Sequence, residues 1–452
     1  MGKLFGTDGI RGPANQYPMT PEMAVKTGKA VAFHFKETVS GNYKPGIILG
    51  RDTRISGPML ESALASGIVS MGVDVHLTGV LPTPGIARMI FKKQALGGVV
   101  VSASHNPYID NGIKLFDGEG FKLPDTIEGK IENLILDERI RDLNREVTKT
   151  GRIFNIENPV ADYTEFLKAT LPEDLLFDGL KLVFDCANGA TFQAAKQLFG
   201  GLGGETTFLF TDPDGININE NCGSEHPSEL KKEVLNQRAD LGIAFDGDGD
   251  RMLAVDHTGT VVTGDQVIAV LARHLKYGNR LTGNRVVTTV MSNLGLAAAL
   301  TEAGIQHSAS EVGDRYVMEK MKSDGAVLGG ENSGHIIFLN HHTTGDGLLA
   351  ALQLLEAIIV SGHPLSELVK VMTMFPQQLI NVDVQTKPDI NTVPAVGEAI
   401  KEAQDVLGEK GRVLVRYSGT QSICRVMVEG PTEEVTNRLC KMIAGAVHQH
   451  LG

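Results

Sequence analysis

Short apolar runs alternate with helix-length stretches along most of this chain. A strand-length apolar run, a polar loop, a helical stretch and a second apolar run occur three times. The paired runs are Gly46–Leu49 with Val73–Leu77, Leu180–Phe184 with Thr206–Phe210, and Arg285–Val290 with Ile305–His307. Such alternation is typical of parallel α/β layers. We therefore predict an α/β fold with three repeated α/β units, each with a mixed or parallel sheet.

The loop before the helix in each unit is rich in small or polar residues. These loops are Asp52–Gly57, Asn188–Thr191 and Ser292–Gly295. Serine, threonine and asparagine are favoured at the N-cap because their side chains can accept a hydrogen bond from the first helical turn. We expect helix caps at these three places.

The last part of the chain has a different pattern. It has an apolar run at Ile380–Val384, a helix from about Val393 to Leu407, strands around Val413 and Val426, and a closing helix from about Thr432. This order predicts a smaller C-terminal α+β domain. The pattern resets near residues 155–159, 256–259 and 375–376, so the predicted domains are 1–154, 155–255, 256–374 and 375–452.

A serine and a histidine follow the buried run Leu96–Val101, in the segment Ser102–Pro107. That run is typical of an interior strand, and Asn106-Pro107 predicts a turn directly after it. Open α/β sheets bind their ligands at the carboxyl ends of strands, so a serine here is a candidate nucleophile. A Ser/Asn turn that only caps the next segment is the alternative, and this segment alone does not decide between them.

Three aspartates alternate with glycines in Asp246-Gly247-Asp248-Gly249-Asp250-Arg251, between two apolar runs. Two carboxylates about 4 Å apart repel by roughly 4 kcal/mol at an effective dielectric constant of 20. A bound cation would remove this repulsion, and oxygen ligands favour Mg²⁺ or Ca²⁺. The sequence indicates a metal site here, with a solvated acidic turn as the alternative.

Two further loops carry polar groups beside glycines. In Gly329–His335, glutamate, serine and histidine can hydrogen-bond a sugar or move a proton. In Arg416–Gln421, a guanidinium, two hydroxyls and a glycine offer the parts of a phosphate-binding loop. A hydrophilic turn with a surface arginine is the alternative for the second loop.

Composition excludes several classes of function. The formal net charge of −12 argues against nucleic-acid and acidic-membrane partners, and 5% aromatic residues without tryptophan leave few stacking surfaces. The cysteines are too few and scattered for a disulfide framework or a zinc cluster. They are Cys186, Cys222, Cys424 and Cys440. Because we find no signal-like start and no apolar stretch near 18 residues, we expect a cytoplasmic protein without a membrane partner.

In this order along the whole chain, the four loops resemble those of the α-D-phosphohexomutase superfamily. Its members move a phosphoryl group between O6 and O1 of a hexose. Three more segments resemble the members that act on glucosamine phosphates: Phe5–Gly12, Asn217–Ser224 and Val312–Val317. The resemblance implies three α/β domains and a smaller fourth domain around a central cleft, with each loop contributed by a different domain.

The resemblance also implies a role for each loop residue. Ser104 is the phosphate-carrying nucleophile, and its phosphate completes a Mg²⁺ shell formed by Asp246, Asp248 and Asp250. Arg11, His105 and Lys114 surround the phosphoserine and assist proton transfer. The implied substrate-binding residues are Arg251 near the metal, Glu331, Ser333 and His335 for the sugar, and Arg416, Ser418, Gly419, Thr420 and Arg425 for the phosphate that does not react.

Two departures from the superfamily pattern concern substrate binding. The phosphate loop usually continues Ser-Gly-Thr-Glu-Pro, but here Gln421-Ser422 follows Thr420. Loss of the proline is expected to loosen this loop without removing its attraction for phosphate. In the sugar loop, Asn332 stands where members acting on glucosamine phosphates commonly have glutamine, which leaves the substrate preference less defined.

The implied activity is an isomerase, an intramolecular phosphotransferase. It would interconvert glucosamine 6-phosphate and glucosamine 1-phosphate and supply amino-sugar nucleotide and cell-wall precursor synthesis. One Mg²⁺ per chain, hexosamine or glucose 1,6-bisphosphate as an activator, and a homodimer are expected with it. The alternatives are a phosphomannomutase or phosphoglucomutase, a sugar-phosphate-binding protein without turnover, and a metal-dependent phosphatase. An acidic chain must gather positive charge locally for such ligands, and Arg51 and Arg54 could join the arginines named above.

Overall fold

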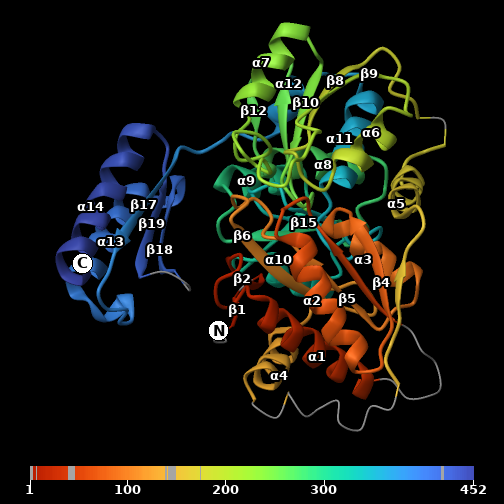
Figure 1. Ribbon diagram of the computed structural model, residues 1–452. Helices are drawn as coiled ribbons and strands as arrows, with labels where there is room; N and C mark the ends of the chain where they lie inside the picture. The colour runs from red at the N-terminus through yellow and green to blue at the C-terminus, as the bar shows by residue number, and fades with distance from the viewer. Residues whose placement is uncertain are drawn as a thin grey trace. The chain divides into compact units, whose positions relative to one another are not determined.

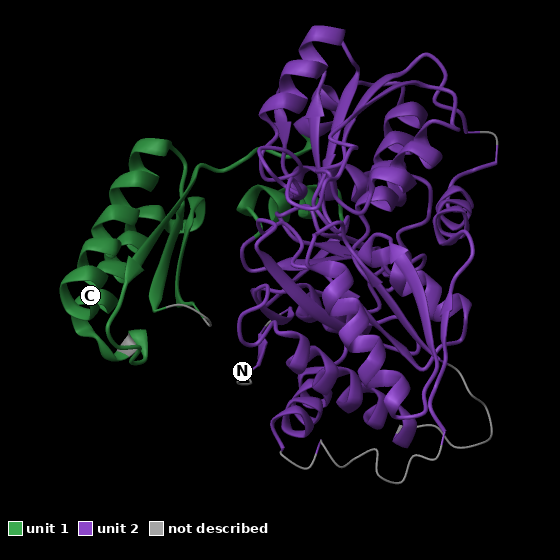
Figure 2. Ribbon diagram, in the orientation of Figure 1, with its two compact units in different colours: residues 1, 292–304, 371–452 green, residues 2–291, 305–370 purple. Residues whose placement is uncertain are grey.

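The computed structural model describes residues 4–6, 8–38, 46–137, 140, 149–173, 175–418 and 422–452. The chain forms two compact units, which Figure 2 shows in different colours. The larger unit comprises residues 2–291 and 305–370, and the smaller one comprises residues 292–304 and 371–452 besides residue 1. Figure 1 gives the labels used below.

The first sheet of the larger unit has the strand order β1-β2-β6-β5-β3-β4-β7. Its strands are β1 (Phe5–Gly6), β2 (Gly9–Pro13), β3 (Ile47–Arg51), β4 (Val75–Val80), β5 (Gly97–Val101), β6 (Asp110–Asp117) and β7 (Ile153–Asn155). Its helices are α1 (Pro21–Thr38), α2 (Gly57–Ser70), α3 (Thr83–Lys92) and α4 (Asp125–Leu136). Strand β5 runs parallel to β3 but antiparallel to β6, so the sheet is mixed.

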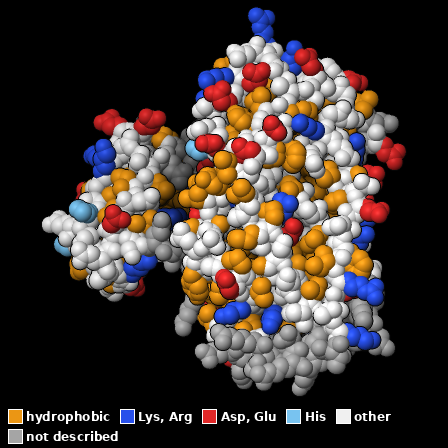
Figure 3. All heavy atoms as spheres, in the orientation of Figure 1, with side chains coloured by type: hydrophobic (Ala, Val, Ile, Leu, Met, Phe, Trp, Pro, Cys, Tyr) orange, Lys and Arg blue, Asp and Glu red, His pale blue; other side chains and the backbone are white. Residues whose placement is uncertain are grey.

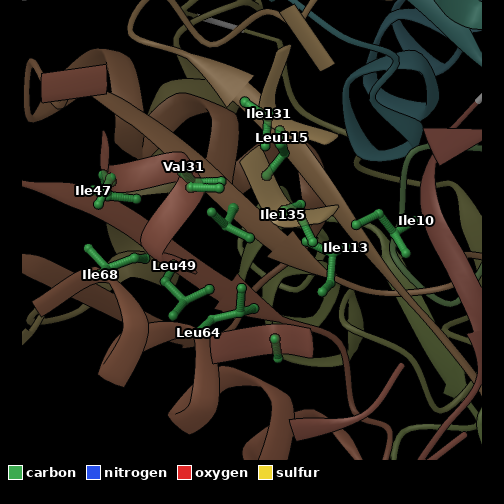
Figure 4. Close-up of a cluster of buried hydrophobic side chains, with 14 of the residues drawn as sticks. Ile10, Val31, Ile47, Leu49, Leu64, Ile68, Ile113, Leu115, Ile131 and Ile135 are labelled. Carbon is green, nitrogen blue, oxygen red and sulfur yellow. The ribbon is translucent and has the colours of Figure 1, made fainter. Parts of the chain in front are cut away.

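Buried branched side chains of the first sheet and its helices form one core (Figure 4). Ile47 and Leu49 of β3 and Ile113 and Leu115 of β6 are at most 2% exposed, and helices α1, α2 and α4 contribute further members. Burying a side chain of this size typically contributes 1.5–3 kcal/mol, roughly, so this core fixes β5 and β6 in place.

The second and third sheets repeat one plan. The second, in the order β12-β11-β10-β8-β9, and the third, in the order β14-β13-β15-β16, each join parallel strands to an antiparallel edge. These elements are α5 (Pro159–Lys168), β8 (Lys181–Asp185), α6 (Phe192–Phe199), β9 (Glu205–Leu209), α7 (Ser228–Gln237), β10 (Leu241–Phe245), β11 (Met252–Asp256), β12 (Val261–Val262), α8 (Gly264–Tyr277), β13 (Arg285–Thr289), α9 (Leu294–Glu302), β14 (Gln306–Ser310), α10 (Asp314–Asp324), β15 (Leu328–Gly330), β16 (Ile336–Phe338), α11 (Gly347–Ser361) and α12 (Leu365–Leu368).

The strand orders β6-β5-β3-β4, β11-β10-β8-β9 and β16-β15-β13-β14 correspond to one another. This confirms the three α/β repeats that the sequence predicts. In each repeat, one of the candidate loops connects the last parallel strand to the antiparallel strand beside it: residues 102–109, 246–251 and 331–335. The predicted domain limits at 154/155, 255/256 and 374/375 stay predictions.

The C-terminal part of the smaller unit has a three-stranded antiparallel sheet, in the order β17-β19-β18. Its elements are β17 (Gln377–Asp383), α13 (Pro394–Leu407), β18 (Arg412–Tyr417), β19 (Ile423–Glu429) and α14 (Glu433–Leu451). Helices α13 and α14 pack on the sheet through a core that includes Val396, Val426 and Ile443. The predicted small α+β domain is thereby confirmed.

Helix α9 belongs to this smaller unit although it lies earlier in the sequence. Asn293 Nδ2 donates to the Phe375 carbonyl at 2.9 Å, and the Leu294 N–H donates to Glu429 Oε2 at 3.3 Å. Arg412 also donates to the carbonyl of Ser292 and forms an ion pair with Glu429 at 2.6 Å. Side-chain bonds thus tie α9 to the C-terminal sheet.

The predicted helix caps are only partly right. Asn293 accepts from the Gly295 N–H, as expected for a cap. Ser56 and Thr191 precede α2 and α6, but their side chains make no cap bond. Both have φ near −75° and ψ near −15°, which is helical backbone. A capping side chain needs the extended backbone that Asn293 has.

Among the described residues, no single helix is long and apolar enough to cross a membrane; α11 and residues 365–371 pass on length and composition only as a pair bent by 88°. On the face drawn in Figure 3, acidic and basic side chains of the described residues are interspersed.

Candidate active site

Ser104 lies directly after β5 with its backbone in the left-handed region, at φ +54°. For a residue with a β-carbon this conformation costs about 1–2 kcal/mol, so the surrounding loop must hold it. The Ser104 N–H donates to Ser102 Oγ at 2.9 Å, and Ser102 Oγ donates to Asp52 Oδ2 at 2.6 Å. The Ser104 side chain is therefore presented from a fixed turn rather than from a flexible loop.

Arg54 and Asn219 hold the other side of this turn. Arg54 Nη2 and Asn219 Nδ2 each donate to the Ser104 carbonyl at 2.9 Å. Arg54 also donates to the Pro107 carbonyl at 2.6 Å and pairs with Asp52 at 2.9 Å, and it is fully buried. Arg54 thus holds the serine turn, a role that the sequence did not suggest; its predicted contribution to the local positive charge for a phosphorylated ligand stays a prediction.

The Ser104 hydroxyl faces the aspartate loop between β10 and β11. Ser104 Oγ donates to Asp246 Oδ2 at 2.6 Å, and the two loops approach closely. A β-carbon added at Gly247 would lie only 2.6 Å from the Ser104 carbonyl oxygen. Glycine at this position therefore allows the serine and the aspartates to share one site.

Asp246, Asp248 and Asp250 are all buried, and one oxygen of each lies within 4.8 Å of the others. Burial, together with Asp250 and Asp248, raises the pKa of Asp246 well above its usual value. Asp248 Oδ2 accepts from Thr83 Oγ1 at 2.6 Å, whereas its buried Oδ1 accepts no hydrogen bond from the part of the chain that the structure describes. An open acceptor within three hard oxygen ligands fits a divalent cation such as Mg²⁺ or Ca²⁺.

Lys114 of β6 is the cation closest to this triad. Its Nζ lies 2.8 Å from Asp248 Oδ2, 3.5 Å from Asp250 and 3.4 Å from Asp8, and the side chain is 1% exposed. Burial opposes its charge, but the three carboxylates outweigh burial and raise the pKa of Lys114. Lys114 is therefore charged at every physiological pH.

Arg11 and His105 are two further predicted groups near the serine, Arg11 through a contact with Ala103 and His105 as the next residue of the chain. Arg11 forms an ion pair with Asp8 and donates to the Ala103 carbonyl at 3.3 Å. Burial, and then the nearby Arg251, lower the pKa of His105, so its imidazole is neutral near pH 7. Its buried Nδ1 has no hydrogen-bond partner among the described residues, which leaves that nitrogen available to a ligand.

Arg251 completes the aspartate loop. The backbone N–H of Arg251 donates to Asp246 Oδ1 at 3.1 Å. Its guanidinium lies 3.9 Å from both Asp250 and Glu225, which is longer than a direct hydrogen bond. Although burial opposes the charge, Asp250 and Asp246 raise the pKa of Arg251, so it stays cationic.

The predicted sugar-binding residues lie in the loop between β15 and β16, which belongs to the larger unit, as the serine and aspartate loops do. Glu331 Oε1 accepts from the Gly313 N–H at 3.1 Å. His335 Nδ1 lies 3.7 Å from Asp250 Oδ1, so this loop lies next to the aspartate triad. Ser333 Oγ is buried and has no hydrogen-bond partner in the described residues.

The predicted phosphate loop lies in the smaller unit, between β18 and β19. Arg416 and Arg425 are directly opposite in the antiparallel pair of strands, so both side chains project from the same face. Burial and then Arg425 lower the pKa of Arg416. The Nε atoms of both arginines are buried and have no hydrogen-bond partner among the described residues.

Ser418 begins the turn that follows these arginines. Its carbonyl accepts from Lys387 Nζ at 2.8 Å, and its N–H donates to the Ile423 carbonyl at 2.9 Å. Gly419 and Thr420, the other predicted residues of this loop, lie outside the described residues, as does Gln421.

Four models of one family match the chain in order. They are phosphoglucomutase/phosphomannomutase alpha/beta/alpha domain I at residues 2–141, domain II at 161–259, domain III at 263–375 and the C-terminal domain at 379–446. The chain belongs to the phosphoglucomutase/phosphomannomutase family. This confirms the resemblance drawn from the four loops.

Individual members of this family match over the full length. The phosphoglucosamine mutase of Syntrophus aciditrophicus is 55% identical over 452 residues and that of Syntrophobacter fumaroxidans is 52% identical, in each case over the whole of both chains. A solved phosphoglucomutase/phosphomannomutase family protein from Burkholderia thailandensis superposes with a TM-score of 0.80. It is 25% identical, and the match covers 98% of this chain and 97% of that one.

Several residues near the candidate site of this chain were not assigned a role in the sequence analysis. Asp8, Asn219 and Asp314 lie in segments that support the resemblance, but nothing in those segments shows what they contact. Asp8 pairs with Arg11 and Asn219 holds the serine turn. Lys122 pairs with both Asp8 and Asp314.

Proposed function

We propose that this chain is a phosphoglucosamine mutase, which interconverts glucosamine 6-phosphate and glucosamine 1-phosphate. The chemistry rests on one observation: the Ser104 hydroxyl lies 2.6 Å from a carboxylate of a buried aspartate triad. The preference for an amino sugar is supported by the full-length relatives that are 55% and 52% identical. The reaction consists of two phosphoryl transfers through phosphorylated Ser104, with a hexosamine 1,6-bisphosphate between them.

Asp246, Asp248 and Asp250 would hold Mg²⁺, together with an oxygen on Ser104. Mg²⁺ supplies positive charge to the oxygens of a phosphoryl group during transfer. The open Oδ1 of Asp248 supports this assignment because a buried acceptor without a donor is costly unless a cation or water meets it.

In the first transfer, the bond between Ser104 Oγ and phosphorus breaks as the free sugar hydroxyl attacks that phosphorus. The sugar hydroxyl gives up its proton, and Ser104 Oγ gains one when it leaves. His105 suits proton transfer because its neutral imidazole has an open nitrogen. Lys114, Arg11 and Arg251 keep their charge and stabilise the phosphoryl oxygens. The second transfer reverses these bond changes with the other phosphate of the bisphosphate.

Two further groups would position the sugar phosphate. Glu331, Ser333 and His335 would bind sugar hydroxyls, and the open Ser333 hydroxyl supports this role. Arg416, Ser418 and Arg425 would hold the phosphate that does not react, with Gly419 and Thr420 as further expected members of that loop. The paired guanidiniums support an anion at this place because an anion would relieve their repulsion.

Three accompanying expectations remain part of this proposal. Glucose or hexosamine 1,6-bisphosphate would activate the enzyme, since it can return a phosphate to unmodified Ser104. We further propose a cytoplasmic location and a homodimer.

The deciding experiment follows glucosamine 6-phosphate, glucose 6-phosphate and mannose 6-phosphate by phosphorus NMR. Each reaction contains the protein, Mg²⁺ and a trace of hexose 1,6-bisphosphate. A C1 phosphate signal that forms fastest from the amino sugar is expected. A faster reaction of a neutral hexose would replace the proposal by a phosphoglucomutase or phosphomannomutase. Release of free phosphate alone would indicate a phosphatase, and no change would indicate a binding protein.

A further inference from the structure

A largely enclosed lysine that received no role from the sequence, Lys122, joins two segments near the predicted site. Lys122 follows β6, and its Nζ lies 2.5 Å from Asp8 Oδ1 and also contacts Asp314 Oδ2 at the start of α10. Its side chain is 10% exposed. Burial opposes the charge of this lysine, but Asp314 and Asp8 raise the pKa of Lys122. Lys122 is thus a permanent cation between two carboxylates.

Asp8, the first of these carboxylates, contacts cations on the metal side of the proposed site. Asp8 Oδ2 lies 3.4 Å from Lys114 Nζ, and Asp8 also pairs with Arg11. Lys114 in turn lies 2.8 Å from Asp248 of the triad. The position of Asp8 therefore affects how Lys114 divides its contacts between Asp8 and the aspartates.

Asp314, the second carboxylate, lies near His335 of the proposed sugar loop. Asp314 Oδ2 lies 3.7 Å from His335 Nε2, and His335 Nδ1 lies 3.7 Å from Asp250. His335 therefore lies between a carboxylate that Lys122 holds and a member of the triad.

Lys122, Asp314 and His335 line a cavity of about 100 Å³. Ligand pockets typically measure roughly 300–1,000 Å³, so this cavity is too small for a hexose phosphate. The small volume therefore fits a role in which Lys122 acts through its neighbours.

We propose that Lys122 is a positioning residue that sets the places of Lys114 and His335 through Asp8 and Asp314. The inference rests on the proposed mutase reaction, because it concerns how the groups of that reaction are held. The side chain of Lys122 would then link the groups around Ser104 to the sugar loop.

Removal of Lys122 leaves the partly buried carboxylates of Asp8 and Asp314, 23% and 13% exposed, without the cation between them. A carboxylate that loses such a partner moves, takes up a proton or draws on another cation. Asp8 would then draw on Lys114, and Asp314 would no longer be fixed beside His335. A misplacement of about 1 Å can cost about 100-fold in rate.

The test compares K122M, K122R, D314N and the K122M/D314N double variant with the wild type in glucosamine 6-phosphate turnover. We expect K122M to lower kcat about 10- to 100-fold with KM within about threefold. K122R should recover most of the rate because arginine can bridge two carboxylates. If Lys122 acts through Asp314, the double variant should lose about as much as K122M alone.

The matched control is K92M. Lys92 forms an ion pair with Asp162 at 2.8 Å, but its side chain is 41% exposed and far less enclosed than that of Lys122. K92M should keep the wild-type kcat. If K122M does not fold, D314N decides in its place, since it breaks the same bridge from the other side.

A folded K122M with kcat within about twofold of the wild type would overturn the positioning role and leave the mutase reaction standing. Equal losses in K122M and K122R, or losses that add in the double variant, would also overturn it. A wild type without turnover would overturn the proposed mutase function, and the positioning role with it.

Discussion

The two charged regions of this molecule are built on opposite principles. Around the serine, cations contact carboxylates: a single lysine, Lys114, lies within 3.5 Å of three of them. In the C-terminal sheet, Arg416 and Arg425 are directly opposite one another, and no carboxylate among the described residues pairs with either. In the first region the cations are thus paired with carboxylates of the protein itself, whereas in the second two cations lie opposite one another.

This difference fits the division of binding and chemistry that we propose. A network of buried, paired charges keeps its geometry before substrate arrives, which is what transition-state stabilisation requires. Like charges on neighbouring strands destabilise a sheet slightly, so an anion that binds there relieves an existing repulsion. The comparison predicts that neutral substitutions will affect the two regions in opposite ways.

The largest effect is expected at the serine. Ser104→Ala removes the oxygen that would carry the phosphate, so turnover should fall by about 10⁴-fold or more. The buried turn should keep its backbone bonds, because these involve the N–H and carbonyl of residue 104. Turnover by phosphorus NMR and a thermal melt of the same sample test both statements. Retained activity would contradict the role of Ser104.

Lys114→Met tests the charge balance of the first region. Loss of one partner from a buried ion pair typically destabilises by about 3–5 kcal/mol. We expect a loss of that size in urea unfolding with EDTA present, because Asp248, Asp250 and Asp8 then face one another without the lysine. Mg²⁺ should restore part of the loss. An unchanged unfolding curve in EDTA would show that the region is not held by its charges.

Asp346, which lies next to the first region in the fold, allows the pH dependence of stability to be tested. It caps α11, and Tyr163 donates to it at 2.8 Å. The next residue, Gly347, donates its N–H to the Gly249 carbonyl of the aspartate loop. Burial raises the pKa of Asp346 to about 7 from an ordinary value of 3.8.

Between these two pKa values the folded chain holds a proton that the unfolded chain has lost. The contribution of Asp346 to stability therefore falls by about 1.4 kcal/mol per pH unit from about pH 4 to pH 7, and is level above that. From pH 5.5 to 7 the loss is about 2 kcal/mol. Asp346→Asn should remove this slope from the free energy of unfolding. A slope that is unchanged in the variant would assign it to other groups.

The smallest effect on stability is expected at Arg416. Arg416→Met removes a like-charge repulsion, so the free energy of unfolding should stay the same or rise by up to about 0.5 kcal/mol. Substrate binding should nevertheless weaken, with KM raised about tenfold and kcat changed less. Urea unfolding and steady-state kinetics give the two values. If Arg416→Met destabilised the chain as much as Lys114→Met, the contrast between the regions would be wrong.

Local patterns predicted the repeats and the loops because strand periodicity and glycine spacing are local properties. The aspartate triad is close in sequence, and its members meet in one buried loop as expected. The contacts of Lys122 join residues that are 114 and 192 positions apart. Nothing near a single lysine in the sequence indicates two such distant partners.

Arg54 shows a second limit of the sequence. Its sequence context shows a cation near a loop, but its partners are carbonyl groups, which every residue has. Cap prediction has the same difficulty, since Ser56 and Asn293 are both good capping types and only their backbone angles separate them. Residue type shows what a side chain can do, and the fold decides which of its options it takes.

The attachment of α9 to the C-terminal sheet sets an order of events during synthesis. Ribosomes make Asn293 about 80 residues before Phe375 and well over 100 before Glu429, and all three belong to one set of bonds. The bonds that tie α9 to the C-terminal sheet therefore cannot form until the end of the chain has been made. A fragment that starts at residue 371 would leave the fully buried Glu429 without the Leu294 N–H. The smaller unit is compact in space but, apart from residue 1, consists of two separate stretches of the chain.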